Sequence, residues 1–315
     1  MMDRRQCLRL ALGAGAVLGL GPRFTLAAGG GPLIVRPIPS SGERVPVIGL
    51  GSSATFRSVA EGADVAGLAE VLKTLVAGGG SVFDTAPSYG ASEEVAGRLA
   101  QELGIAGKLF WATKVNVAQR GGSADPAAAR AQLEESFRRA GARTLDLVQV
   151  HNLGDVPVQL GILKELKADR RVRYIGVTST NKDQYGDLAR VMREEPLDFI
   201  GVDYAIDNRS IEEAILPLAA ERGIAVMVYA PFGRTRLFKR VGDSPLPAWA
   251  ADFDAASWGQ FFLKYVLGHP AVTVVTPATS KAGNMADNLG GGAGRTPDEP
   301  MRRRMAELID ALPQA

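Results

Sequence analysis

Short apolar segments alternate with amphipathic segments over almost the whole chain, after a polar lead-in with the turn-forming run SSGER at 40–44. The apolar segments carry apolar residues on both faces, which is typical of strands that are covered on both sides. Eight strands are therefore predicted, at 46–50, 81–84, 109–114, 145–150, 172–177, 198–202, 224–229 and 272–276. The segments between them repeat apolar residues at helical spacing and predict helices at 64–77, 92–103, 126–140, 156–168, 182–194, 210–222, 258–268 and 282–289.

Residues at the ends of these segments support the predicted helices. In Asp125–Pro126 an acidic N-cap precedes a proline at the first helical position, and the hydroxyl of Ser210 is a suitable cap for the helix at 210–222. Glycine adopts the left-handed conformation in which many helices end. Three predicted helices are expected to end in this way, at Gly104, Gly141 and Gly223.

The alternation of strand and helix predicts the fold. Strands buried on both faces and joined by crossover helices require a parallel sheet, and eight such units close naturally into a (β/α)₈ TIM barrel. A doubly wound open sheet is the alternative, but the phosphate-binding G-x-G-x-x-G is absent, because 49–54 reads GLGSSA. We expect one domain over 32–315, with the irregular stretch 231–257 on the catalytic face.

Composition excludes several classes of site. Lys plus Arg number 36 and Asp plus Glu number 34, intermixed along the chain, so nothing indicates nucleic-acid binding. The only cysteine is Cys7, which excludes an intramolecular disulfide and a multi-cysteine metal site. The only two histidines, His151 and His269, lack the close spacing on one helix that zinc hydrolases use. No metal site is predicted.

The first thirty residues have the layout of a signal peptide. A basic segment at 3–9 precedes an apolar run at 10–21, and small residues follow through Ala28. The apolar run is about a dozen residues long, too short for the roughly 20 that span a bilayer. The alternative is an N-terminal helix packed on the barrel, which would have to be built largely from glycine.

The pair Arg4–Arg5, followed by Leu8, resembles a twin-arginine signal, although Cys7 takes a place usually held by an apolar or aromatic residue. We therefore expect residues 1–28 to be a signal peptide that contacts the twin-arginine export machinery transiently. The mature protein is expected to be periplasmic or secreted, with no stable membrane span.

Four polar residues lie where consecutive predicted strands end. Asp84 closes the second strand, Tyr89 follows in its loop, Lys114 closes the third strand and His151 follows the fourth. The carboxyl ends of barrel strands meet at one face, so these side chains are expected to converge. A phenol is a poor acid–base catalyst at neutral pH, but an adjacent ammonium such as Lys114 lowers its pKa by about 1 to 3 units. Asp84 would keep Lys114 charged.

This set resembles the catalytic residues of the aldo-keto reductases in order and approximate spacing. The similarity covers about residues 40 to 290 and extends to other motifs of that family, at 49–51 (GLG), 84–90 (DTAPSYG), 146–151 (DLVQVH), 175–179 (IGVTS), 229–234 (YAPFGR) and 276–291 (TPATSKAGNMADNLGG). The resemblance implies a reductase that interconverts a small-molecule carbonyl compound and an alcohol, with Tyr89 as the general acid or base. His151 would orient the carbonyl oxygen, and NADP(H) would supply the hydride.

The resemblance also implies which residues hold NADP(H). Tyr229 would stack on the nicotinamide ring, and the segment from Pro231 through Gly233 and Arg234 to Leu237 would pass along the pyrophosphate. At the start of the last predicted helix the adenosine phosphate would be held by Thr279, Ser280 and Lys281, and the adenine would be met by Asp287 and Asn288. Lys281 favours NADP(H) over NAD(H).

The sequence departs from the family pattern at three places. Thr178 and Ser179 stand where Ser-Asn is common, and Gly201 stands where a glutamine usually holds the carboxamide. Asn284 replaces a common arginine. These departures concern how the carboxamide and the 2′-phosphate of the cofactor are bound. Two alternatives also stay open beside the reductase: a cofactor-binding, redox-sensing or partner subunit with incidental turnover, and an enzyme that never releases its nicotinamide.

Overall fold

The structure is a computed structural model that describes residues 31–313, so the predicted signal peptide at 1–28 lies outside the described residues. Eight parallel strands form one sheet in the order β10-β9-β8-β7-β6-β5-β4-β3. These strands are β3 (Leu50–Gly51), β4 (Val82–Asp84), β5 (Phe110–Val115), β6 (Leu145–Val150), β7 (Val172–Ser179), β8 (Phe199–Asp203), β9 (Ala225–Tyr229) and β10 (Val272–Val275). All eight predicted strands are thus present, and the first begins later than expected.

The two edges of this sheet meet and close it into a barrel. Parallel bridges join Ile48 to Val275 and Gly51 to Ala278, and the Gly51 amide donates to the carbonyl of Pro277 at 3.1 Å. A Cβ at Gly51 would lie 2.6 Å from the carbonyl oxygen of Thr276, so only glycine permits this close approach. The predicted TIM barrel is confirmed, and the open doubly wound sheet is excluded.

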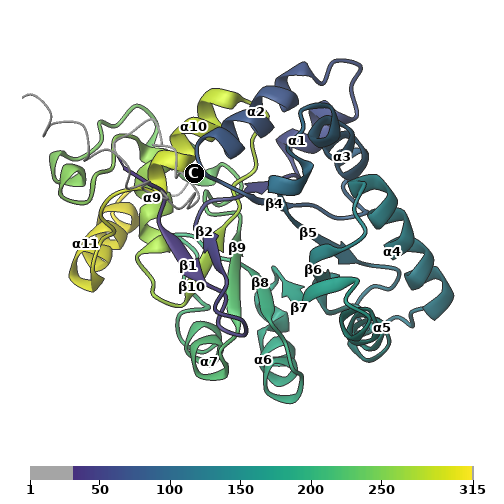
Figure 1. Ribbon diagram of the computed structural model, residues 1–315. Coiled ribbons are helices and arrows are strands. Elements are labelled where there is room, and N and C mark those ends of the chain that lie inside the picture. Colours follow the sequence, from purple (N-terminus) through teal and green to yellow (C-terminus); the bar gives the residue numbers. More distant parts are fainter. Residues whose placement is uncertain (1–30, 314–315) are drawn as a thin grey trace, which may run out of the picture.

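Helices that follow the strands cover the outside of the barrel, as Figure 1 shows. They are α2 (Ala66–Ala77), α3 (Ser92–Glu102), α4 (Pro126–Ala140), α5 (Val156–Ala168), α6 (Tyr185–Glu194), α7 (Ile215–Arg222), α9 (Trp258–Leu267) and α10 (Ala282–Gly291). All correspond to predicted helices. Among residues 31–313, three further α-helices were not predicted, namely α1 (Thr55–Ala60), α8 (Arg236–Val241) and α11 (Glu299–Asp310). No helix between residues 31 and 313 combines the length and apolar character that crossing a bilayer requires.

The helix ends follow the predicted residues in all but one case. The Asp125 side chain accepts a hydrogen bond from the Ala127 amide at the start of α4. Gly141 and Gly223 end α4 and α7 with φ of 63°, and Gly104 follows the end of α3 with φ of 64°. These positive φ values are the left-handed conformation that glycine adopts without strain.

The predicted cap at Ser210 is wrong. Helix α7 begins at Ile215, and the Ser210 hydroxyl contacts the Asn208 side chain instead of a helix amide. Pro217 gives the reason, because proline has no N–H and clashes with the carbonyl four residues before it. A helix that contains Pro217 is therefore favoured only when this residue falls in the first turn, as it does in α7.

A hairpin of β1 (Val35–Pro37) and β2 (Arg44–Pro46) packs against the barrel near β10. Its turn contains the predicted run at 40–44, but its strands were not predicted because each has only three residues. Ile38 and Val45 are buried in a cluster with inward-facing barrel residues such as Phe110 and Phe199. The hairpin therefore supplies apolar side chains to the barrel interior, at the end opposite the carboxyl ends of the strands.

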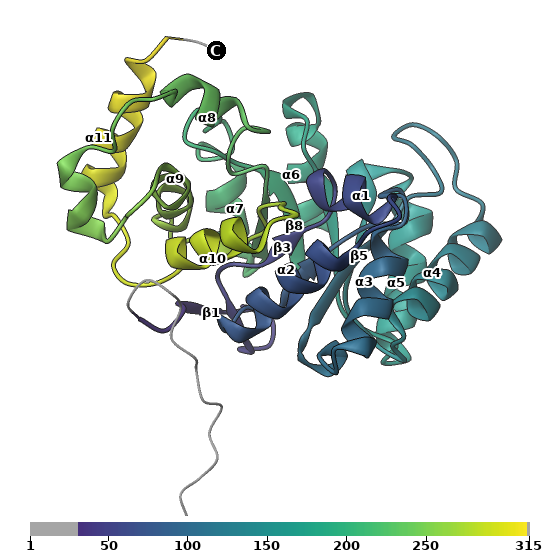
Figure 2. The same ribbon diagram turned by 90° about the horizontal axis from the view of Figure 1, so that it is seen from above.

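Helix α11 packs beside α8 and α9 on one side of the barrel (Figure 2). Arg302 of α11 donates to the Tyr265 carbonyl at 3.1 Å and to the Glu212 carboxylate at 2.6 Å. Met305 and Ile309 complete its buried face. Only these three residues of the helix are buried, so its apolar stripe is too narrow to stand out in a strongly charged sequence.

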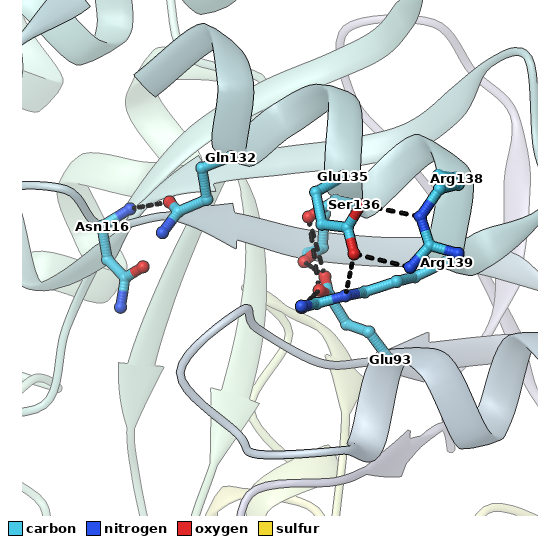
Figure 3. Close-up of polar contacts among 8 residues, drawn as sticks. Glu93, Asn116, Gln132, Glu135, Ser136, Arg138 and Arg139 are labelled. Carbon is cyan, nitrogen blue, oxygen red and sulfur yellow. Dashed lines mark hydrogen bonds and ion pairs between the residues drawn. The ribbon is translucent and has the colours of Figure 1, made fainter. Parts of the chain in front are cut away.

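A buried carboxylate joins α3 to α4 (Figure 3). Glu93 accepts hydrogen bonds from Ser136 at 3.1 Å and Arg139 at 3.2 Å, and also from Thr113 of β5. The two helices approach so closely here that a Cβ at Gly97 would lie 1.8 Å from the carbonyl oxygen of Arg139. The glycine and the partly buried ion pair of Glu93 and Arg139 together fix the packing of these helices.

Gly97→Ala is expected to lower the free energy of unfolding by about 1 to 3 kcal/mol, because the backbone of α4 must move away from the added methyl group. Urea denaturation measures this change. Gly161→Ala is the matched control, because Gly161 also lies inside a helix but has no atom within 4 Å of the added Cβ. That variant is expected to gain up to about 1 kcal/mol from helix propensity. Equal effects of the two substitutions would contradict the packing argument.

Candidate active site

The four residues predicted to be catalytic converge at one end of the barrel. Asp84 is the last residue of β4, Lys114 is the penultimate residue of β5, and His151 follows β6 directly. Tyr89 lies in the loop between β4 and α3. All four line one cavity of about 590 Å³.

Lys114 is fully buried and held by three oxygen atoms. Its Nζ donates to Asp84 Oδ1 at 2.8 Å, to Asp84 Oδ2 at 3.0 Å and to the Thr85 carbonyl at 2.8 Å. Burial alone would lower the pKa of Lys114, but Asp84 and Tyr89 outweigh that effect and raise it above its usual value. Lys114 therefore carries a positive charge at neutral pH.

Tyr89 packs close to both Lys114 and His151. Lys114 Nζ is 5.1 Å from the centroid of the Tyr89 ring, and the His151 ring packs edge-on against Tyr89 at 5.9 Å between centroids. The loop turns sharply after Tyr89, where Gly90 has φ of 55° and lies against Glu61. The local backbone thus holds the phenol at the cavity wall next to a fixed ammonium.

The electrostatic environment of Tyr89 corrects one expectation. Burial raises the pKa of Tyr89 above 10, and the neighbouring Lys114 offsets this increase only in part. The expected net decrease is therefore wrong for the free protein, because the phenol is buried as well as close to a cation. Tyr89 is protonated at neutral pH and can donate a proton.

His151 is neutral over most of the pH range. Burial, followed by the positive charge of Lys114, lowers the pKa of His151 from 6.5 to about 4. A neutral imidazole carries one N–H donor, which suits a residue that binds a carbonyl oxygen without transferring its own proton.

His151 is expected to titrate near pH 4, as followed by NMR of its imidazole resonances. The folded pKa lies below the unfolded value, so His151 favours the folded state above pH 6.5 and this contribution is lost as the pH falls toward 4. His269→Gln leaves a single histidine in the predicted mature chain and assigns the signal. A midpoint near 6.5 would show that the imidazole is solvated rather than buried beside Lys114.

The predicted cofactor residues fall into two groups. Four of them line the same cavity as the four converging residues, namely Thr178, Tyr229, Pro231 and Arg234. Thr178 also accepts a hydrogen bond from the Asn152 amide at 2.9 Å, which fixes the residue after His151. Gly233 lines an adjoining pocket of about 270 Å³.

The other predicted cofactor residues lie outside the cavity wall. The Ser179 hydroxyl is buried and donates to Gln184 at 2.8 Å. Thr279, Ser280 and Lys281 lead into α10, with Lys281 at its N-cap. The Asp287 carboxylate accepts hydrogen bonds from Ser257 and Gln260 of the α9 region, and Asn288 is buried. The expected adenine contacts of these last two residues stay predictions.

The loop after β9 is held in an unusual backbone conformation. Ala230, Arg234 and Thr235 have φ of 49°, 55° and 76°, where residues with a Cβ are strained. Such strain persists only where the surrounding structure imposes it and is common at binding sites. The loop therefore has a defined shape along the cavity.

One buried residue at the centre of the site was not predicted. Gln149 of β6 is fully buried, and its Oε1 accepts a hydrogen bond from the Tyr229 hydroxyl at 2.9 Å. The sequence does contain one indication of this residue, because Gln149 is the single polar residue within the apolar run LVQV. Within residues 31–313, no group of three or more His, Cys, Asp or Glu side chains could hold a metal ion.

Solved structures of known proteins share this fold. An aldo-keto reductase from Bacillus halodurans, in its holo form, matches 90% of this chain and 97% of its own, with a TM-score of 0.70 and 22% identity. An aldo-keto reductase from Klebsiella pneumoniae in complex with NADPH matches 87% of this chain and 94% of its own, with a TM-score of 0.70 and 23% identity. At this identity the two structures establish the fold alone.

Sequence comparisons establish the family. The probable aldo-keto reductase 1 of Glycine max is 28% identical over 280 residues, which are 77% of this chain and 78% of that protein. Aldo-keto reductase str7 of Strobilurus tenacellus is 26% identical over 273 residues, 76% of this chain and 80% of that protein. The model of the aldo/keto reductase family matches residues 47–304, which include the whole barrel and all four converging residues. The chain therefore belongs to the aldo/keto reductase family.

Proposed function

We propose that the protein is an NADP(H)-dependent oxidoreductase that interconverts an aldehyde or ketone and the corresponding alcohol. The observation that carries this proposal is the convergence of a phenol, a charged lysine and a neutral histidine on one cavity, with Asp84 bonded to the lysine. A carbonyl oxygen placed near Tyr89 and His151 would meet a proton donor and a hydrogen-bond donor together.

The residues around the cavity fit a nicotinamide dinucleotide. Tyr229 offers an aromatic ring at the cavity wall, and the strained loop after β9 continues from it through Pro231 and Arg234. The N-terminus of α10 carries Lys281, and both the helix dipole and this side chain favour a phosphate group there. The likeness to a reductase solved with NADPH supports NADP(H) as the cofactor.

The chain's own residues account for the proton and for the orientation of the substrate. When bound, reduced nicotinamide supplies the hydride that no side chain can provide. The Tyr89 hydroxyl donates its proton to the carbonyl oxygen, and Lys114 stabilises the negative charge that this leaves on the phenol. His151 keeps its proton and orients the oxygen by a hydrogen bond.

The test of this function is a nicotinamide-dependent assay on purified protein. NADPH consumption is followed across a panel of aldehydes and ketones, and NADP⁺ reduction is followed with the matching alcohols. Turnover that requires NADP(H) is the expected result. If the protein instead shows no turnover and purifies with a stoichiometric partner protein, the redox-sensing alternative is favoured.

We also propose that residues 1–28 direct export through the twin-arginine pathway, on the strength of Arg4–Arg5 before the apolar run at 10–21. This pathway carries folded proteins, which suits a protein that binds its cofactor in the cytoplasm. Replacing Arg4 and Arg5 by lysine is expected to retain the protein in the cytoplasm, as fractionation and blotting would show. Mass analysis of the exported protein for bound nicotinamide tests whether the cofactor travels with it.

A further inference from the structure

The hydroxyl of Tyr229 points toward the buried centre of the catalytic site. It lies 2.9 Å from Gln149 Oε1 and 3.3 Å from Asp84 Oδ1, so its single hydrogen is shared between an amide and a carboxylate. Lys114 Nζ lies 5.1 Å from the centroid of the Tyr229 ring, the same distance as from the Tyr89 ring. Tyr229 thus contacts the Asp84–Lys114 pair through its hydroxyl, whereas stacking on a cofactor would need only its ring.

Gly201 of β8 provides the space for this contact. A Cβ at Gly201 would lie 2.5 Å from Cε2, 2.6 Å from Oη and 2.8 Å from Cζ of Tyr229. Real Cβ atoms essentially never approach other heavy atoms so closely. The Tyr229 ring therefore occupies the volume that a side chain at position 201 would fill, where the resemblance to the family implies a glutamine.

Gln149 fixes the direction of the hydroxyl. The Gln149 amide nitrogen faces the carbonyl oxygen of Val177 at 3.5 Å, and a carbonyl can only accept a hydrogen bond. Gln149 Oε1 is therefore left for Tyr229, which must act as the donor. Burial raises the pKa of Tyr229 well above 10, with the negative charge of Asp84 adding to the effect, so this phenol keeps its hydrogen at any physiological pH.

We propose, on the basis of the function proposed above, that Tyr229 is a positioning residue for the Asp84–Lys114 pair and that Gly201 admits its hydroxyl to the pair. The hydroxyl stabilises the Asp84 carboxylate by donating to Oδ1, one of the two oxygen atoms that also accept from Lys114. Asp84 in turn holds Lys114 beside Tyr89, so the effect reaches the acid–base group through two buried contacts. A substitution at Gly201 and a substitution at Tyr229 are then expected to affect the same contact, so their effects should not add.

Tyr229→Phe separates this role from stacking, because it keeps the ring and removes the hydroxyl. We expect kcat to fall about tenfold, the size of effect that one hydrogen bond to a charged group has. KM and the dissociation constant for NADPH, measured by fluorescence titration, are expected to stay within about twofold, because aromatic stacking is retained.

The pH profile gives a readout that a merely structural role would not change. The hydrogen bond from Tyr229 lowers the pKa of Asp84 against the larger effect of burial, so its loss raises that pKa further. In a plot of kcat against pH, the midpoint of the acidic limb is expected to move to higher pH by about one unit. The other titratable groups around the cavity are Arg57, Tyr89, Lys114, His151 and Arg234. NMR titration of His151 in the variant separates its protonation from that of Asp84.

Two further variants complete the experiment. Gly201→Ala should displace the ring and produce the same change in kcat, and the double variant with Tyr229→Phe should be no worse than either alone. Tyr174→Phe is the matched control, because this tyrosine bonds Ser41 and Glu43 near the hairpin and contacts no catalytic residue. It should leave kcat and the pH profile unchanged.

Wild-type kcat and pH dependence in Tyr229→Phe would overturn the proposal, as would additive losses in the double variant. If circular dichroism shows that Tyr229→Phe is unfolded, Gly201→Ala is used in its place, and kcat and the acidic limb of its pH profile are measured. Loss of turnover in Tyr89→Phe with no effect in Tyr229→Phe would reject this inference and leave the proposed function standing.

Discussion

Tyr89→Phe is expected to lower kcat for carbonyl reduction by about 10²- to 10⁴-fold, the contribution that a positioned general acid makes. The Tyr89 ring centroid lies 5.1 Å from Lys114 Nζ and 5.9 Å from that of His151, so its hydroxyl is the phenol placed beside both groups at the cavity wall. NADPH binding should change little, because the ring remains. Steady-state kinetics and fluorescence titration on the same protein measure both quantities.

The control for this prediction is Tyr185→Phe. The Tyr185 hydroxyl donates to Asp203 at 2.7 Å and does not line the catalytic cavity, so its removal should leave kcat unchanged. A Tyr89→Phe variant with wild-type turnover would mean that another group protonates the substrate, and the proposed acid–base role of Tyr89 would be rejected.

Lys114→Met is expected to abolish measurable turnover and to lower the free energy of unfolding by about 3 to 5 kcal/mol. The side chains of Lys114 and Asp84 are 1% and 4% exposed, so the substitution leaves a carboxylate buried without its cation. Burial raises the pKa of Asp84 and Lys114 opposes that increase. Without Lys114 the raised pKa favours a protonated Asp84, and the loss of stability should therefore be smaller at pH 5 than at pH 8.

Urea denaturation of the double variant Asp84→Leu/Lys114→Met is the control. Replacing a buried ion pair by apolar residues of similar volume is often neutral, so most of the lost stability should return while the protein stays inactive. A double variant as unstable as Lys114→Met would show that the loss comes from packing rather than from an unpaired charge.

The barrel was predictable because its strands are apolar on both faces and each is followed by an amphipathic helix. The same regularity located Asp84, Lys114 and His151, since polar residues directly after buried strands must face the catalytic end. Helix α11 escaped prediction because its buried face includes Arg302, whose partners Glu212 and Tyr265 lie far away in the sequence.

The pKa changes and buried contacts of the site were less predictable from the sequence than the identity of its residues. The sequence places an ammonium near a phenol, but the sign of the net pKa change of Tyr89 depends on how much water the folded chain excludes. The role of Gln149 depends in the same way on Tyr229, which lies 80 residues later and reaches it only because Gly201 has no side chain.

Closure of the barrel has a consequence for the order in which the protein is made and folded. Ile48 pairs with Val275, so the seam joins segments 227 residues apart by the difference of their numbers. A chain still leaving the ribosome exposes the β3 edge, and with it an unpaired row of backbone groups, until β10 has emerged. Closure of the barrel therefore has to wait for the last strand, and until then the first edge is the part of the sheet most exposed to pairing with another chain.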